Sequence, residues 1–138
     1  MSRSKQACED KGKQFGVELA PVEARDHSSV QTALEGAQVV FGAGKAGIRL
    51  LDAEQWQKHD SIEILADVST AEPLGFEGIN MNDRNTERFG KKVFGGLGIG
   101  ALKLKLHRAC IGRLFTSNDQ VLDADAIYKI AQQMTGSR

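Results

Sequence analysis

Hydrophobic residues along the chain occur in short runs that alternate with segments of helical pattern, and this alternation predicts an α/β fold. The two clearest apolar runs cover residues 38–41 and 61–66, and a brief third run covers residues 92–94. Short apolar runs separated by helices are typical of buried parallel strands joined by crossover helices. We therefore expect a mostly parallel sheet with helices on both of its faces. The apolar stretch at 17–22 also reads as a strand, and its proline favours a strand end or the sheet edge.

Five segments have the sequence pattern of helices. Gly16 and Gly36 are suitable stops for the first two, and serine or aspartate near the start of later ones can act as an N-cap. The expected helices cover residues 4–15, 28–35, 52–57, 101–115 and 123–134. Residues 83–90 are predicted to form a polar loop.

The helix expected from residue 101 carries basic residues on its apolar side. At 100° per residue its apolar side chains form two adjacent rows, one of Leu102, Leu106, Cys110 and Leu114 and the other of Leu104, Ile111 and Phe115. Lys103 and His107 fall inside the arc of these rows. A buried ammonium group is costly unless it is paired, so Lys103 is expected to reach a polar cavity or a ligand. Alternatively, Lys103 extends from the edge of the core to solvent and His107 is a hydrogen-bonded structural histidine.

A glycine-dense segment, residues 95–100, precedes this helix. Glycine allows another group to approach the backbone closely, and a helix that starts after such a loop presents free N–H groups to an anion or a polarised carbonyl. The alternating leucines and lysines at 102–106 would also suit an amphipathic strand. However, leucine favours a helix and the helical spacing continues to Phe115, so we expect a helix.

Small or polar residues follow all three buried strands, at 42–44, 67–70 and 95–100. In parallel α/β sheets ligands bind beyond the carboxyl ends of the strands, so one ligand lying across this edge would meet all three segments. Each segment can also be only a turn. Residues 42–47 match Gly-x-Gly-x-x-Gly by letter, but no full-length helix is expected after them, which favours a loop near a ligand over a diphosphate cradle.

Composition excludes several classes of function. The chain has 138 residues, about the size of one domain, and carries 18 basic and 18 acidic residues with no long basic run. We therefore expect neither nucleic acid nor an anionic membrane surface as its main partner. Cys8 and Cys110 lie far apart and the N-terminus is charged, which fits a reducing, cytoplasmic setting. No residues have metal-site spacing and no apolar stretch is long enough to cross a membrane, so we expect no structural metal and no membrane span.

The stretch from Phe94 to Cys110, together with residues 62–67, 73–79 and 123–129, closely resembles the NADP-dependent methylene-tetrahydromethanopterin dehydrogenase family. Some relatives of this family use methylene-tetrahydrofolate, and the resemblance runs through nearly the whole chain. Its members carry an N-terminal substrate-binding domain followed by a Rossmann domain. Residues 1–138 resemble the C-terminal portion of that Rossmann domain, starting just after its second strand, without the substrate domain.

The resemblance implies a reaction and a set of site residues. Hydride transfer from the methylene bridge of a reduced pterin to NADP would give a methenyl product, and Lys103 matches the lysine that would orient or polarise the pterin. A cation and hydroxyl groups near the adenosine ribose suit the 2′-phosphate of NADP, although without the resemblance these residues are only a polar N-terminus. The implied cofactor-binding residues are Ser2, Arg3, Ser4 and Lys5 at the adenosine ribose, Gly42, Ala43 and Gly44 near the ribose and nicotinamide, Asp67 and Val68 in the same cleft, and Gly96, Leu97 and Gly98 beside the nicotinamide and pterin.

A Rossmann sheet without its first two strands lacks the central strand and its glycine fingerprint. Its third and fourth strands would be separated by a gap two strands wide, which leaves exposed edges and a route to homo-oligomers or other self-association. We therefore expect little or no dehydrogenase activity from the isolated chain. Two alternatives remain: a non-catalytic remnant that binds a partner protein through its open sheet edge, and another small-substrate Rossmann enzyme such as a shikimate-dehydrogenase-like protein. A shikimate-dehydrogenase-like protein would explain the strand pattern but not the sequence of residues 95–110.

Overall fold

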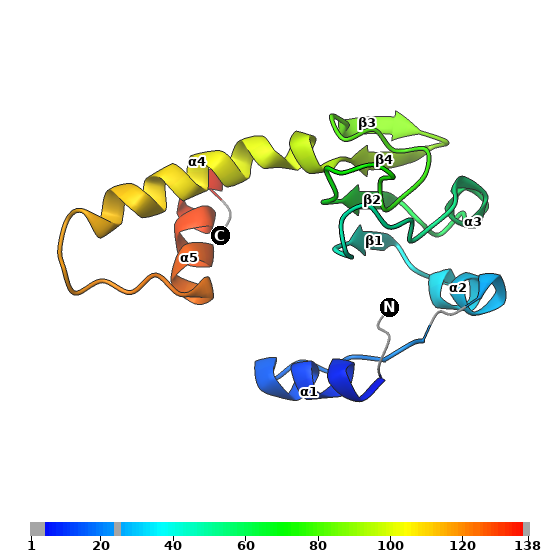
Figure 1. Ribbon diagram of the computed structural model, residues 1–138, viewed down its shortest axis with the longest axis horizontal. Coiled ribbons are helices and arrows are strands. Elements are labelled where there is room, and N and C mark those ends of the chain that lie inside the picture. The colour runs from blue at the N-terminus through cyan, green and yellow to red at the C-terminus, as the bar shows by residue number, and fades with distance from the viewer. Residues whose placement is uncertain (1–4, 24–25, 137–138) are drawn as a thin grey trace.

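A four-stranded sheet lies at one end of a long helix, which projects away from it (Figure 1). The computed structural model describes residues 5–23 and 26–136. The strands are β1 (Val39–Gly42), β2 (Ile64–Asp67), β3 (Arg84–Arg88) and β4 (Lys91–Phe94), arranged in the order β1-β2-β4-β3. β1, β2 and β4 run parallel and β3 runs antiparallel to β4. The predicted α/β class, with a mostly parallel sheet and flanking helices, is confirmed.

Helices occur where the sequence predicts them, within a few residues. They are α1 (Lys5–Phe15), α2 (His27–Leu34), α3 (Ala53–Gln57), α4 (Gly96–Leu114) and α5 (Ala124–Thr135). Gly16 and Gly36 follow α1 and α2 with φ of +64° and +69°, as expected for helix stops. The Asp26 carboxylate accepts a hydrogen bond of 2.8 Å from the Ser29 N–H and thereby caps α2. This hydrogen bond lowers the pKa of Asp26 below its ordinary value.

The apolar core lies on one face of the sheet. Leu65 of β2 and Val93 of β4 are paired in register and are fully buried. Trp56 of α3 is also fully buried, and its indole N–H donates to the Glu77 carbonyl at 2.9 Å. The core consists of Val30, Leu34, Leu51, Trp56, Ile62, Leu65, Phe76, Ile79 and Val93. Burial on this face explains the apolar character of β2 and the apolar Val93 of β4.

The opposite face of β1 is open. Val39 and Phe41 point away from the core because side chains alternate along a strand, and both are more than half exposed. Their backbone N–H and C=O groups face the free edge of the sheet, since the alternate residues Val40 and Gly42 face β2 in a parallel pair. Around β1, helices therefore cover one face only, and the prediction of helices on both faces is wrong there.

Two other sequence predictions are wrong. Residues 83–90 are not a loop: they contain β3 and a two-residue turn, Phe89–Gly90, in which both residues have positive φ, at 52° and 72°. Residues 17–22 form no strand, so the third Rossmann strand and its two-strand gap are not formed in the described part of the chain. β3 is polar and forms through its pairing with β4, whereas 17–22 has an apolar pattern but no partner strand.

Candidate ligand-binding edge of the sheet

The three segments that follow the parallel strands come together at one edge of the sheet. The register pairs Gly42 with Asp67 and Ala66 with Phe94, so β1, β2 and β4 end at the same level. The Val68 N–H donates to the Gly42 carbonyl at 3.1 Å. The structure therefore gathers residues 42–44, 67–70 and 95–98, which is the arrangement that the sequence predicts for a shared edge.

Glycines at the start of α4 are required by close packing. A Cβ atom on Gly96 would lie 2.8 Å from the Val68 carbonyl oxygen and 2.9 Å from that of Ser69, and one on Gly98 would overlap the Asp83 carbonyl. The helix begins at Gly96, so the predicted glycine loop at 95–100 is in fact the N-cap and first turns of the helix. The start of α4 is thus wedged between residues 67–70 and 80–83.

The first N–H groups of α4 are already bonded to protein. Leu97 and Gly98 both donate to the Met81 carbonyl, at 2.8 and 3.1 Å. The sequence pattern predicts that such groups are free for an anion, and for the N–H groups of Leu97 and Gly98 this prediction is wrong. The cause is the chain between β2 and β3, which folds back over the helix start and occupies its donors.

Asp67 lies at the predicted edge, but its carboxylate points inward. The side chain is buried and accepts hydrogen bonds from the Ser69 N–H at 2.9 Å and the Phe76 N–H at 3.0 Å. Its two oxygens therefore fix the shape of the loop 68–76. Gly42 is similarly enclosed, since a Cβ atom there would lie 2.8 Å from the ring of Phe76.

Most exposed side chains of this edge are small or apolar, with Thr70 as the exposed polar residue. Ala43, Gly44, Val68 and Leu97 are exposed, at the ends of β1 and β2 and in the first turn of α4. Such a surface suits the face of a planar ring. Behind it, Gly42, Asp67, Gly96 and Gly98 determine the backbone shape.

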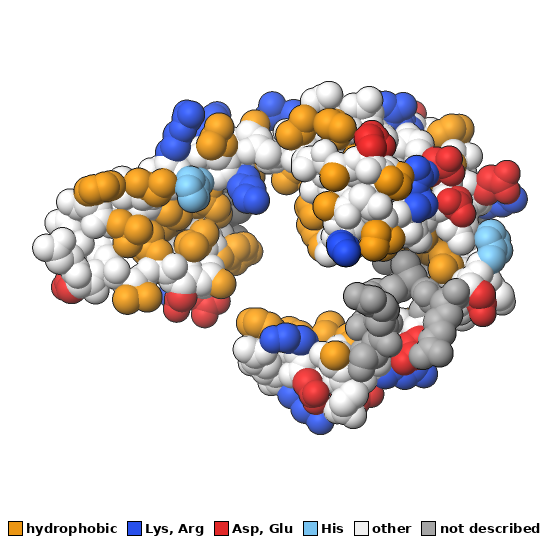
Figure 2. Space-filling view, in the orientation of Figure 1, with side chains coloured by type: hydrophobic (Ala, Val, Ile, Leu, Met, Phe, Trp, Pro, Cys, Tyr) orange, Lys and Arg blue, Asp and Glu red, His pale blue; other side chains and the backbone are white. Residues whose placement is uncertain are grey.

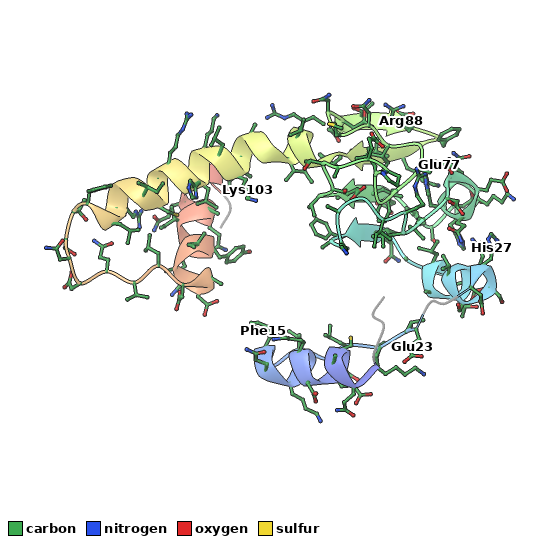
Figure 3. All side chains as sticks on the ribbon, viewed as in Figure 1. Phe15, Glu23, His27, Glu77, Arg88 and Lys103 are labelled. Carbon is green, nitrogen blue, oxygen red and sulfur yellow. The ribbon has the colours of Figure 1, made fainter. Side chains whose placement is uncertain are left out.

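An ion pair that the sequence analysis missed supports the start of α4. The Asp83 carboxylate, which is buried, accepts from Arg88 Nε at 2.7 Å and Nη2 at 2.8 Å, and from the Asn80 N–H at 2.7 Å. Burial raises the pKa of Asp83, but the hydrogen bonds from Arg88 and Asn80 outweigh it and hold the pKa below its ordinary value. Arg88 of β3 is labelled in Figure 3. The only sequence signal was an aspartate and an arginine five residues apart in a polar segment.

Lys103 lies on α4 about 10 Å along the helix from Gly96, given a rise of about 1.5 Å per residue. It is exposed, and Figure 3 shows it on the underside of α4, toward α5. The desolvation argument for Lys103 is therefore wrong for this chain, because the apolar rows around it are not buried. Cys110 is the one buried residue of α4, while the other row members are half-buried or exposed. His107 is exposed as well.

Of the four residues expected to contact the 2′-phosphate, only Lys5 lies in the part of the chain that the structure describes. Ser2, Arg3 and Ser4 lie outside the described residues. Lys5 opens α1, which Figure 1 places away from the carboxyl ends of the strands.

The described residues contain neither a membrane-spanning helix nor a cluster of metal ligands. No helix in the described ranges is both long and apolar enough to cross a bilayer. Within residues 5–23 and 26–136, no three or more His, Cys, Asp or Glu side chains gather in a way that could hold a metal ion.

The described residues fit the nicotinamide end of a nicotinamide dinucleotide but not its diphosphate. The exposed apolar edge suits the nicotinamide ring, but the segment 42–47 offers no diphosphate cradle, since a Cβ atom on Gly44 would lie 2.8 Å from Leu50. No helix starts until Ala53, so this letter match lacks the helix N-terminus that binds a diphosphate. The structure agrees here with the sequence interpretation.

Comparisons with known proteins identify relatives, although no protein-family model matches the chain. The chain is 46% identical over 134 residues to the bifunctional protein MdtA of Methylorubrum extorquens, covering 97% of the chain and 46% of MdtA. It is 26% identical over 125 residues to the NAD(P)-dependent methylenetetrahydromethanopterin dehydrogenase of the same organism, covering 88% of the chain and 42% of that enzyme. The chain thus spans a little under half the length of these curated relatives. Both alignments run through most of the chain, so the predicted resemblance is confirmed: the chain is homologous to a part of MdtA and to a part of the NAD(P)-dependent methylenetetrahydromethanopterin dehydrogenase.

Proposed function

We propose that residues 1–138 are the C-terminal portion of the NADP-binding Rossmann domain of a methylene-tetrahydromethanopterin or methylene-tetrahydrofolate dehydrogenase, acting in the cytoplasm. One observation supports this most directly. The segments 42–44, 67–70 and 95–98 meet at one sheet edge in a chain that is homologous to an NAD(P)-dependent methylenetetrahydromethanopterin dehydrogenase. The reaction is hydride transfer from the methylene bridge of the reduced pterin to NADP.

The proposed roles of the edge residues follow from their exposure. Ala43, Gly44, Val68 and Leu97 contact the nicotinamide and its ribose, because all four are exposed at the edge. Gly42, Asp67, Gly96 and Gly98 act by shaping the backbone beneath them. NADP, when bound, supplies the hydride acceptor. Residues Ser2, Arg3, Ser4 and Lys5 remain the proposed contacts of the 2′-phosphate.

Lys103 is the proposed catalytic residue, which orients or polarises the pterin. Its ammonium group is exposed on α4, so it is available to a substrate bound beside the helix. An ammonium group is a compact hydrogen-bond donor that suits a pterin carbonyl or ring nitrogen.

The isolated chain is expected to have little or no dehydrogenase activity, because the described edge lacks a diphosphate cradle. Calorimetric titration with NADP tests this on the chain and on a form extended by the remaining part of MdtA. Binding is expected only for the extended form. Oxidation of a methylene-pterin with NADP by the purified chain alone would refute the proposal of an incomplete site. If Lys103→Ala in the extended form left turnover and pterin affinity unchanged, the role of Lys103 would be wrong.

A non-catalytic protein-interaction module is the second candidate. The exposed apolar side chains of Val39 and Phe41 on an edge strand favour it, since such an edge can pair with another chain. NADP titration of the extended form separates the two candidates, because only a dehydrogenase predicts saturable NADP binding there.

A further inference from the structure

One side of α4 carries a row of exposed apolar side chains. Leu104, Ile111 and the C-cap residue Phe115 fall within about 40° of one another around the helix, at 100° per residue. Their side chains are 51%, 41% and 87% exposed, respectively. We call these three residues the α4 stripe. A stripe of this kind on a 19-residue helix is the pattern of a face that packs against another element.

The helix α5 covers a different side of α4. Cys110 is buried there, and Arg113 donates from Nη2 to Gln133 Oε1 at 2.8 Å across the α4–α5 contact. Cys110 and Arg113 lie roughly 100° or more around the helix from the centre of the α4 stripe. α4 therefore has two apolar sides, of which α5 occupies one.

The total exposed surface supports the presence of a missing partner. A compact monomer of 15.0 kDa exposes about 7,000 Å² of surface, whereas this chain exposes 9683 Å². The excess of about 2,600 Å² is several times the ~800 Å² that each partner buries in a standard interface. Figure 2 shows hydrophobic side chains gathered over α4 and α5 and on the side of α1 that faces them.

Charge argues against a second copy of this chain as the occupant. α4 carries Lys103, Lys105, Arg108 and Arg113 and no acidic residue. Two α4 stripes packed together would bring like charges to both rims of the contact, which is unfavourable. An occupant with an apolar surface and an acidic rim fits this helix.

We propose that the α4 stripe docks the polypeptide that corresponds to the part of the dehydrogenase relatives not spanned by this chain. The match to MdtA covers only 46% of that protein, so more than half of its length is available to supply this partner. Lys103 and His107 lie between the α4 stripe and the side covered by α5, so docking places them at the margin of the interface. This inference rests on the proposed function and adds the surface through which the two parts of the enzyme meet.

The test uses the chain with an affinity tag, co-expressed with a separate polypeptide that comprises the part of MdtA outside the matched region. The purified material is analysed by size-exclusion chromatography with light scattering. The wild-type chain is expected to retain this polypeptide in a one-to-one complex. Leu104→Asp is expected to weaken the complex at least tenfold, because a carboxylate is placed inside an apolar contact.

Leu102→Asp is the matched control. Leu102 is 47% exposed against 51% for Leu104, and it lies on the same helix about 160° away. It is expected to leave the complex intact. Circular dichroism of each isolated variant should show unchanged helicity, because both leucines are exposed in the chain alone.

Three results would overturn the docking proposal. They are failure of the wild-type chain to retain the polypeptide, equal binding by both variants, and a dimer of the isolated chain that Leu104→Asp converts to a monomer. The last result would identify a second copy as the occupant. A complex that forms but does not bind NADP refutes the proposed function and leaves docking intact, whereas an NADP-binding complex insensitive to Leu104→Asp refutes docking alone.

Discussion

Removing the carboxylate of Asp67 should destabilise the sheet domain strongly. The group is buried and accepts from two backbone N–H groups, those of Ser69 and Phe76, at 2.9 and 3.0 Å. A buried donor left without a partner costs about 1–3 kcal/mol. The Ser69 N–H is only partly buried, so we expect Asp67→Ala to lower the free energy of unfolding by about 2–4 kcal/mol. Asp67→Asn keeps one acceptor and should lose about 1–2 kcal/mol.

Urea denaturation followed by tryptophan fluorescence measures this loss. Trp56 is the single tryptophan of the chain and lies fully buried in the same core, so its emission reports unfolding of the sheet domain. Asp60→Ala removes an exposed carboxylate and should change the free energy of unfolding by less than about 0.5 kcal/mol. A loss below about 0.5 kcal/mol for Asp67→Ala would show that Asp67 does not fix the loop 68–76, and an outward, ligand-facing carboxylate would then be favoured.

Three further predictions concern α4, the buried ion pair and the open sheet edge. Alanine is more favourable than glycine in a helix by about 1 kcal/mol. A Cβ atom on Gly100 would meet no other atom, so Gly100→Ala should raise the melting temperature. Gly98→Ala should lower it, because the new Cβ would overlap the Asp83 carbonyl. The pKa of Asp83 is lowered in the folded chain, so its contribution to stability is present above the unfolded pKa of about 3.9 and is lost as the pH falls through the lower folded value. Urea midpoints between pH 2 and pH 7 should therefore fall less steeply with acid for Arg88→Gln than for the wild type. Phe41→Lys should leave the urea midpoint almost unchanged but reduce any self-association seen by light scattering, because Phe41 is exposed on the edge strand.

Strands were predictable where burial shaped their sequence. β2 is apolar because it is buried in the core, whereas in the run at 38–41 only Val40 packs against the core and Val39 and Phe41 are exposed. β3 reads Arg-Asn-Thr-Glu-Arg and gives no such signal, since an edge strand is held by hydrogen bonds to its neighbour. Residues 17–22 are the opposite case. They have the apolar pattern of a strand but form none, because no neighbouring strand pairs with them.

The helix α4 shows which properties follow from the local sequence and which depend on tertiary packing. Leucine spacing predicted the helix and its two apolar rows, because helical periodicity is a local property of the chain. Whether those rows are buried depends on what lies beside the helix. Both Leu104 and Lys103 are exposed. The position of Lys103 within an apolar arc of the helix therefore did not predict its burial correctly.

The sequence by itself determined the α/β class, the positions of the three parallel strands, the five helices and the strand ends that meet at one edge. Those features follow from periodicity and from the rule that parallel strands end together. Only the tertiary structure showed that the Asp67 carboxylate turns inward and that the Met81 carbonyl takes the first N–H groups of α4. Of these partners only Ser69 is close in sequence to the group it bonds, whereas Phe76 and Met81 reach their partners through the tertiary fold, which no local pattern encodes.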